Sequence, residues 1–115
     1  MVIKFENLIS YILMRMPELS KAPGYDETDN DNPYVAFASF NAFMESDKTR
    51  LLEFLRVSDE IYTNTADPRV INLIKLEIFD SFRDYIPKVM HEVFSEKTRS
   101  AFLVDQKDWE SKRGE

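Results

Sequence analysis

The stretch DPRVINLIKLEIFDSF, residues 67–82, decides the fold class of this chain. It opens with a helix start signal, because Asp67 can accept hydrogen bonds from free backbone N–H groups and Pro68 suits the first helical position. Apolar residues then cover much of a helix circumference; they are Val70, Ile71, Leu73, Ile74, Ile78, Phe79 and Phe82. A helix that is apolar on most sides is usually buried, so we expect residues 68–82 to form the central helix of an all-α domain.

The same kinds of signal predict five further helices. Each has apolar residues at helical spacing, and Asn32 and Asp47 stand where the second and third helices need a cap. We expect the last helix to dock through Phe102 and Trp109, and residues 111–115 to fray. The five expected helices cover residues 5–16, 33–44, 51–62, 86–94 and 97–113.

Little in the chain suggests β-structure. Strand-like alternation of useful length is absent, and the only glycines are Gly24 and Gly114, whereas sandwiches and barrels use glycine at turns with positive φ. The length of 115 residues predicts one compact domain, residues 1–115, with about six helices. A helical bundle and a short HEAT-like stack of helix pairs both stay open, because an Asp-Pro start resembles a HEAT hairpin but no clean internal period is present.

Composition excludes several classes of protein. Hydrophobic residues make up 43% of the chain and charged residues 31%, which is typical of a globular protein. Because there is no cysteine, disulfides and thiolate metal sites are excluded, and we expect cytoplasmic residence. No apolar run approaches the ~20 residues of a membrane span. A signal peptide is not expected, because Phe5-Glu6-Asn7 stand where one would carry basic residues.

The net charge of −6 is unevenly distributed along the chain. Residues 1–67 contain 6 basic and 12 acidic side chains, whereas residues 68–115 contain 9 of each. A nucleic-acid-binding protein needs a basic surface, and an anionic membrane also attracts basic segments. We therefore expect neither of these partners, while a basic protein partner is compatible with the charge.

The acidic excess is densest in YDETDNDNPY, residues 25–34, within an expected long loop over residues 17–32. An EF-hand would need an oxygen ligand at position 5, Gly at 6 and Glu at 12. Counting from Asp29 places Pro33 at 5, and counting from Asp26 places Phe37 at 12, so neither register fits. Two interpretations stay open: a solvated loop that caps the next helix, which we favour, and a surface for a basic partner.

Patterns for catalysis and for metal binding are absent from the chain. Glu77, Asp80 and Asp84 share one expected helix face, but Lys75 and Arg83 alternate with them, so we interpret the trio as an exposed face with local ion pairs. The single histidine, His91, has no serine or cysteine motif beside it. The sequence therefore predicts no enzyme activity, no cofactor and no metal site.

Three stretches carry a resemblance to a known kind of protein. They are ENLISYILMRMPEL (residues 6–19), NPYVAFASFNAFM (residues 32–44) and KTRSAFLVDQKDWE (residues 97–110). In their order and pattern the chain resembles a bacterial family of small acidic helical proteins of unknown function. Some similar proteins are encoded among antibacterial toxin and immunity genes. The family has no catalytic signature whose residues could be identified in this chain.

The resemblance implies an immunity-type function, in which an acidic protein occludes a basic, nuclease-type toxin domain. The expected binding residues are the carboxylates and tyrosines of the acidic stretch, with a second acidic patch on the third helix. They are Tyr25, Asp26, Glu27, Asp29, Asp31, Tyr34, Asp59 and Glu60. The alternative is a generic helical scaffold, adaptor or homo-oligomerising protein that binds through an apolar groove. Both hypotheses leave the oligomeric state open.

Overall fold

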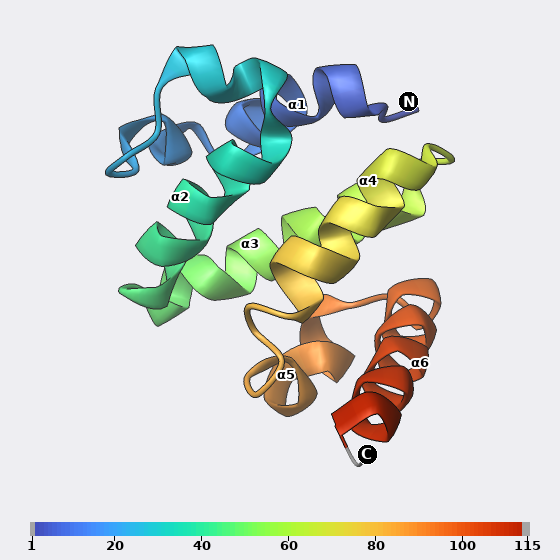
Figure 1. Cartoon of the computed structure of the whole chain (residues 1–115). Coiled ribbons are helices and arrows are strands. Elements are labelled where there is room, and N and C mark those ends of the chain that lie inside the picture. Colours follow the sequence, from blue (N-terminus) through green and yellow to red (C-terminus); the bar gives the residue numbers. More distant parts are fainter. Residues whose placement is uncertain (1, 114–115) are drawn as a thin grey trace.

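Helices make up most of the computed structural model, which describes residues 2–113. In the described part the only extended pairing is one isolated parallel bridge, between Ile3 and Thr65. The prediction of an all-α domain with six α-helices is confirmed (Figure 1). The α-helices are α1 (Leu8–Arg15), α2 (Pro33–Glu45), α3 (Lys48–Thr63), α4 (Pro68–Leu73), α5 (Ile86–Val93) and α6 (Glu96–Arg113). Three 3-10 turns, η1 (Phe5–Asn7), η2 (Pro17–Lys21) and η3 (Glu27–Asp31), and one π-helical turn, η4 (Ile74–Phe79), complete the fold.

The start of α3 and the start of α4 follow the cap chemistry that the sequence predicts. The Asp47 side chain accepts from the backbone N–H of Thr49 at 3.1 Å, and the Asp67 side chain accepts from that of Arg69 at 3.0 Å. The expected cap by Asn32 is wrong, because its side chain makes no cap hydrogen bond. Asn32 also ends η3, where its backbone N–H donates to the Asp29 carbonyl. α2 therefore begins at Pro33 without a side-chain cap.

The core lies where α3 crosses the helical segment formed by α4 and η4 (Figure 1). α3 packs against α2, α5, α6 and η4, so the domain is a helical bundle around a shared helix. The apolar stretch 67–82 is buried as predicted, but it is not one α-helix. α4 ends at Leu73, η4 follows, and residues 80–85 form turns before α5.

Residues 17–32 are more ordered than the single loop that the sequence predicts. Pro17 begins η2, and Leu19 anchors that turn with a fully buried side chain. Gly24 then turns the chain at φ 88°, in a left-handed conformation that favours glycine. A Cβ at this position would lie 3.3 Å from Oγ of Ser39 on α2. The segment is therefore folded against α2 before η3 begins.

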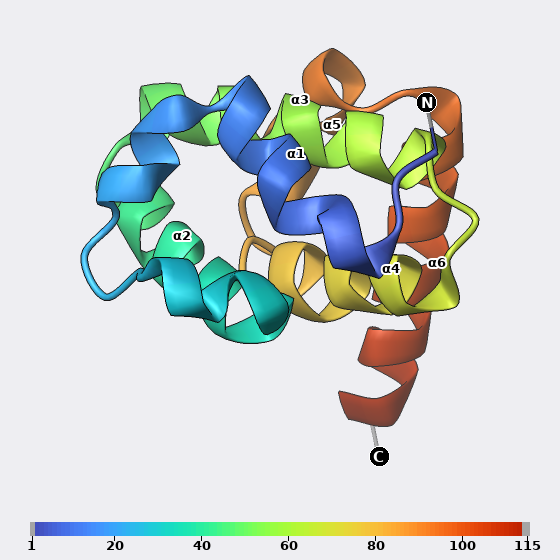
Figure 2. The same ribbon diagram turned by 90° about the horizontal axis from the view of Figure 1, so that it is seen from above.

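The N-terminal segment is held against the connection between α3 and α4 (Figure 2). The Ile3 N–H donates to the Asn64 carbonyl at 2.8 Å, and Thr65 Oγ1 donates to the Ile3 carbonyl at 2.6 Å. The Phe5 N–H donates to Oδ2 of Asp67 at 2.9 Å. We refer to these three contacts as the N-terminal clasp.

The C-terminal helix α6 docks through Phe102 in its first half and through Trp109 in its second half. Phe102 is fully buried and meets Phe79 edge to face at 5.2 Å, while Arg83 lies over the Trp109 ring at 5.0 Å. The end of α6 reaches beyond the other helices (Figure 2). Of the expected frayed tail, residues 111–113 are helical, and 114–115 lie outside the described residues.

Candidate protein-binding surface

The acidic stretch is folded locally as the capped turn η3. The Asp26 side chain accepts from the Thr28 N–H at 3.0 Å, and the Asp29 side chain accepts in return from the Asp26 N–H at 3.1 Å. This reciprocal pair is a capping box, which satisfies N–H groups that the turn leaves free. The backbone of η3 therefore has a defined shape in the absence of any partner.

Tyr25 fixes this turn to the body of the domain. Its ring is half-buried and lies 5.1 Å from that of Phe40 on α2, and its hydroxyl donates to Oδ1 of Asn30. Burial raises the pKa of the Tyr25 hydroxyl, and the charges of Glu27 and Asp29 raise it further. Tyr25 is thus a support for η3 that still presents part of its ring to solvent.

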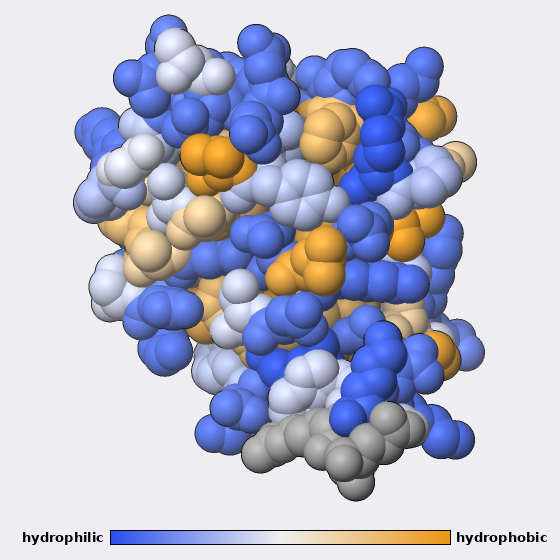
Figure 3. Space-filling view, viewed as in Figure 1, coloured by the Kyte–Doolittle hydropathy of each residue, from blue (hydrophilic) through white to orange (hydrophobic). Residues whose placement is uncertain are grey.

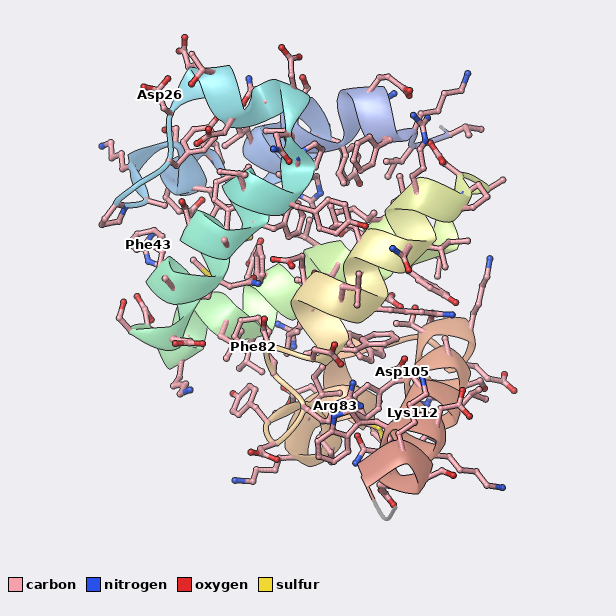
Figure 4. All side chains as sticks on the ribbon, viewed as in Figure 1. Asp26, Phe43, Phe82, Arg83, Asp105 and Lys112 are labelled. Atoms are coloured by element: carbon pink, nitrogen blue, oxygen red, sulfur yellow. The ribbon has the colours of Figure 1, made fainter. Side chains whose placement is uncertain are left out.

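Four carboxylates, those of the N-cap Asp26 and of Glu27, Asp29 and Asp31 in η3, face outward, and we refer to them as the η3 carboxylates. Asp26, Glu27 and Asp31 are exposed and Asp29 is half-buried, and Figure 4 places Asp26 at the outer edge of the molecule. Within residues 2–113, no ion pair reaches any of the four. Their charge is therefore not neutralised by a described cation of the same chain.

Tyr34, the other expected anchor, is tied to different elements. Its ring lies 6.2 Å from the Phe5 ring, and its hydroxyl accepts from Nδ2 of Asn72 at 3.0 Å. Tyr34 therefore bridges the start of α2 to η1 and α4 and is half-buried there. The structure brings Tyr25 together with the four carboxylates, while Tyr34 mainly supports the N-terminal part of the bundle.

Asp59 and Glu60, the expected second acidic patch, bind to other parts of the same chain. Asp59 accepts from both N–H and Oγ of Ser95, directly before α6. Glu60 accepts from Nε and Nη2 of Arg15 at 2.8 and 2.7 Å and from the Tyr11 hydroxyl at 2.8 Å. The Arg15 hydrogen bonds hold the pKa of Glu60 below its usual value. These two carboxylates therefore join α3 to α6 and to α1.

A pocket of about 430 Å³ adjoins the η3 carboxylates. Sequence reasoning missed three of its residues, which are Leu13 on α1, Ser20 on η2 and Asn30 on η3, because the segments that form the pocket meet only in the folded protein. No local pattern in the sequence indicates such a pocket. Its walls are Leu13, Ser20, Tyr25, Asp26, Glu27 and Asn30.

Other titratable groups do not form a second site of this kind. The described residues contain no group of three or more His, Cys, Asp or Glu side chains placed to hold a metal ion. In the expected charged trio, Asp80 pairs with Arg83 as the spacing predicts. Glu77 is half-buried, and burial raises the pKa of its carboxyl, with Asp80 adding to the effect.

Comparison with protein families, with curated proteins and with solved structures found no match to this chain. The resemblance to immunity-associated proteins therefore stays a prediction. Among the described helices, none combines the length and apolar character needed to cross a membrane.

Proposed function

We propose that this chain is a small acidic protein-binding domain that occludes a basic, nuclease-type toxin domain. The contact would be the η3 surface, which we define as Tyr25, the four η3 carboxylates and the adjoining pocket. One observation carries the proposal: four carboxylates lie close together with no ion-pair partner in the described part of the chain. Such charges attract a basic surface and raise association rates by about 10–10³-fold at low salt.

The order of η3 also favours binding. The capping box and the Tyr25–Phe40 contact hold the backbone of η3 and the carboxylates of Asp26 and Asp29 in place before a partner arrives. A preorganised surface loses little conformational entropy on association, so more of the interaction free energy appears as affinity. A flexible acidic loop of the same composition would bind less tightly.

The pocket gives this surface a place for one basic side chain of the partner. The carboxylates of Asp26 and Glu27 complement an ammonium or guanidinium group, and the Tyr25 ring can interact with the same cation. Leu13 supplies an apolar contact for the methylene stem of a lysine or arginine. The proposed occupant is therefore an arginine or lysine at the centre of the interface.

The distribution of apolar surface favours charge over an apolar groove as the means of binding. Figure 3 shows the apolar side chains of one face as separate patches between hydrophilic ones. The large exposed apolar residues are spread over the N-terminal segment, α1, α2, η4 and α6; they are Val2, Met14, Val35, Leu76, Leu103, Val104 and Trp109. A scaffold or adaptor that binds through an apolar groove would need these residues in one place.

The experiment that tests the proposal measures association with a basic domain encoded next to this gene, over a series of salt concentrations. The η3 variant carries Asp26→Asn, Glu27→Gln, Asp29→Asn and Asp31→Asn together. We expect its association rate at low salt to fall by about 10-fold or more, and its salt dependence to flatten.

A matched control separates the position of the charges from their number. The control variant removes four exposed carboxylates outside η3, by Glu45→Gln, Glu53→Gln, Asp84→Asn and Glu96→Gln. We expect it to associate nearly as fast as the unchanged protein. Equal losses in both variants, or no loss in either, would show that the η3 surface does not steer the partner.

A further inference from the structure

The turn η4 differs from the other helices in its backbone hydrogen bonds. The Asp80 N–H donates to the Lys75 carbonyl at 3.2 Å, which is the i→i+5 pattern of a π-helix. The pattern returns to i→i+4 when the Phe82 N–H donates to the Ile78 carbonyl at 3.1 Å. A π turn of this kind contains one residue more than the α turn it replaces.

Asn41 on α2 donates a hydrogen bond to a backbone carbonyl of this turn. In an α-helix the Glu77 carbonyl would accept from the Ser81 N–H. Here Nδ2 of Asn41 donates to the Glu77 carbonyl at 2.8 Å and reaches Oγ of Ser81 at 3.3 Å. The amide of Asn41 therefore donates to the Glu77 carbonyl at the point where the i→i+5 pattern changes to the i→i+4 pattern.

The other end of the Asn41 amide shows that this contact is not incidental. Asn41 is only 5% exposed, and its Oδ1 has no hydrogen-bond partner among the described residues. A buried amide oxygen without a partner is unfavourable, so an apolar side chain would suit the position better unless the amide N–H groups were needed. The group that needs the amide N–H of Asn41 is the Glu77 carbonyl.

The extra residue of η4 changes the direction of the side chains that follow. Each residue of a helix turns by about 100°, so one added residue rotates the next segment by that amount. Arg83, which is 8% exposed, consequently meets α6. Its Nη2 donates to Asp105 at 2.8 Å and to Asp80, and its Nη1 donates to Gln106 at 2.7 Å (Figure 4). With the Trp109 ring, these contacts form what we call the Arg83 clasp.

We propose that Asn41 locks η4 in the π register and that this register determines whether α6 is docked. With the Asn41 donor in place, the Glu77 carbonyl is satisfied and Arg83 points at α6. Without it, the segment satisfies that carbonyl by returning to the α register, which turns Arg83 away and opens the Arg83 clasp. η4 is then a two-state element through which α2 controls α6.

The test uses Trp109, the only tryptophan of the chain, as a reporter of α6 docking. Asn41→Leu keeps the side-chain volume similar and removes the donor. We expect a red-shifted Trp109 emission, equal to that of Arg83→Met, and hydrogen exchange of α6 amides on the order of tenfold faster or more. Phe40→Leu is the control, since it perturbs the core on the same helix and leaves Asn41 intact. If Asn41→Leu matches Phe40→Leu in both measurements, the proposal is overturned.

If Asn41→Leu does not fold, a second variant still tests the proposal. Deletion of Leu76, an exposed residue of η4, removes the extra residue and restores an α register without turning Arg83. Asn41→Leu combined with this deletion should therefore fold, with the Trp109 emission and α6 protection of the unchanged protein. An unfolded double variant, or one whose Trp109 emission is red-shifted relative to the unchanged protein, would contradict the lock.

Discussion

Residues 26–31 and residues 59–67 are both acidic segments of the N-terminal half, yet only the second accepts hydrogen bonds from distant parts of the chain. Asp59, Glu60 and Asp67 accept hydrogen bonds from Ser95, Arg15 and Phe5 respectively, each at least 36 residues away in the chain. The four carboxylates of η3 make only local contacts. Net acidity alone therefore does not identify a binding surface, because what matters is whether arginines and N–H groups from distant parts of the chain already hold the carboxylates.

Among these variants, Asp67→Ala should lower the stability most. It removes the cap of α4, the acceptor for the Phe5 N–H and the ion-pair partner of Arg69 at once. We expect the melting temperature at neutral pH to fall by several degrees, measured by circular dichroism. Asp84→Ala is the control, an exposed aspartate for which the described residues show no ion pair.

The effect of Asp67→Ala should depend on pH. Hydrogen bonds from Arg69, and then from the Phe5 N–H, hold the pKa of Asp67 well below its usual value. A carboxyl with a lowered folded pKa stabilises the protein above its unfolded pKa of about 3.9, and this contribution is lost as the pH falls toward the folded value. The difference between the variant and the unchanged protein should therefore shrink below about pH 4. A constant difference across that range would contradict this account.

Glu60→Gln should have a smaller effect. Arg15 and Glu60 have side chains that are 38% and 35% exposed, so solvent screens their ion pair. We expect the free energy of unfolding to fall by about 0.5–1 kcal/mol at neutral pH, measured by urea denaturation. Because the pKa of Glu60 is lowered, this loss should disappear as the pH falls below about 4.3. Glu53→Gln, at an exposed position on the same helix, should change little at any pH.

The smallest effect on stability is expected in η3. The variant with Asp26→Asn, Glu27→Gln, Asp29→Asn and Asp31→Asn keeps acceptor oxygens for the capping box while it removes the charges. We expect the free energy of unfolding to change by less than about 0.5 kcal/mol. A loss as large as that of Glu60→Gln would erase the contrast between the two segments and would mean that the η3 charges stabilise the fold.

Local signals made most of the secondary structure predictable. The caps of Asp47 and Asp67 and the apolar spacing of α2, α3 and α5 are contained within a few neighbouring residues. The π turn was not predictable in this way. Its hydrogen bonding involves Asn41, which lies 36 residues from Glu77 in the chain, so residues 67–82 alone predict a continuous helix.

The candidate site was predictable only in part. The four η3 carboxylates and Tyr25 are neighbours in sequence and therefore stay together in the fold. Glu60 is as acidic as they are, but its partner Arg15 lies 45 residues away, and nothing near Glu60 in the sequence indicates that contact. Long-range partners thus decide which acidic residues are structural, and they become visible only once the helices are placed.

The N-terminal clasp has a consequence for the order of folding. Most helical contacts join near neighbours and form quickly, whereas the hydrogen bond from the Phe5 N–H to Asp67 spans 62 residues. Closing so long a loop carries a large entropic cost until α1, α2 and α3 have already condensed. The clasp is therefore expected to close late on the folding pathway and to open early on unfolding, so that its strength governs the lifetime of the native state more than the speed of reaching it.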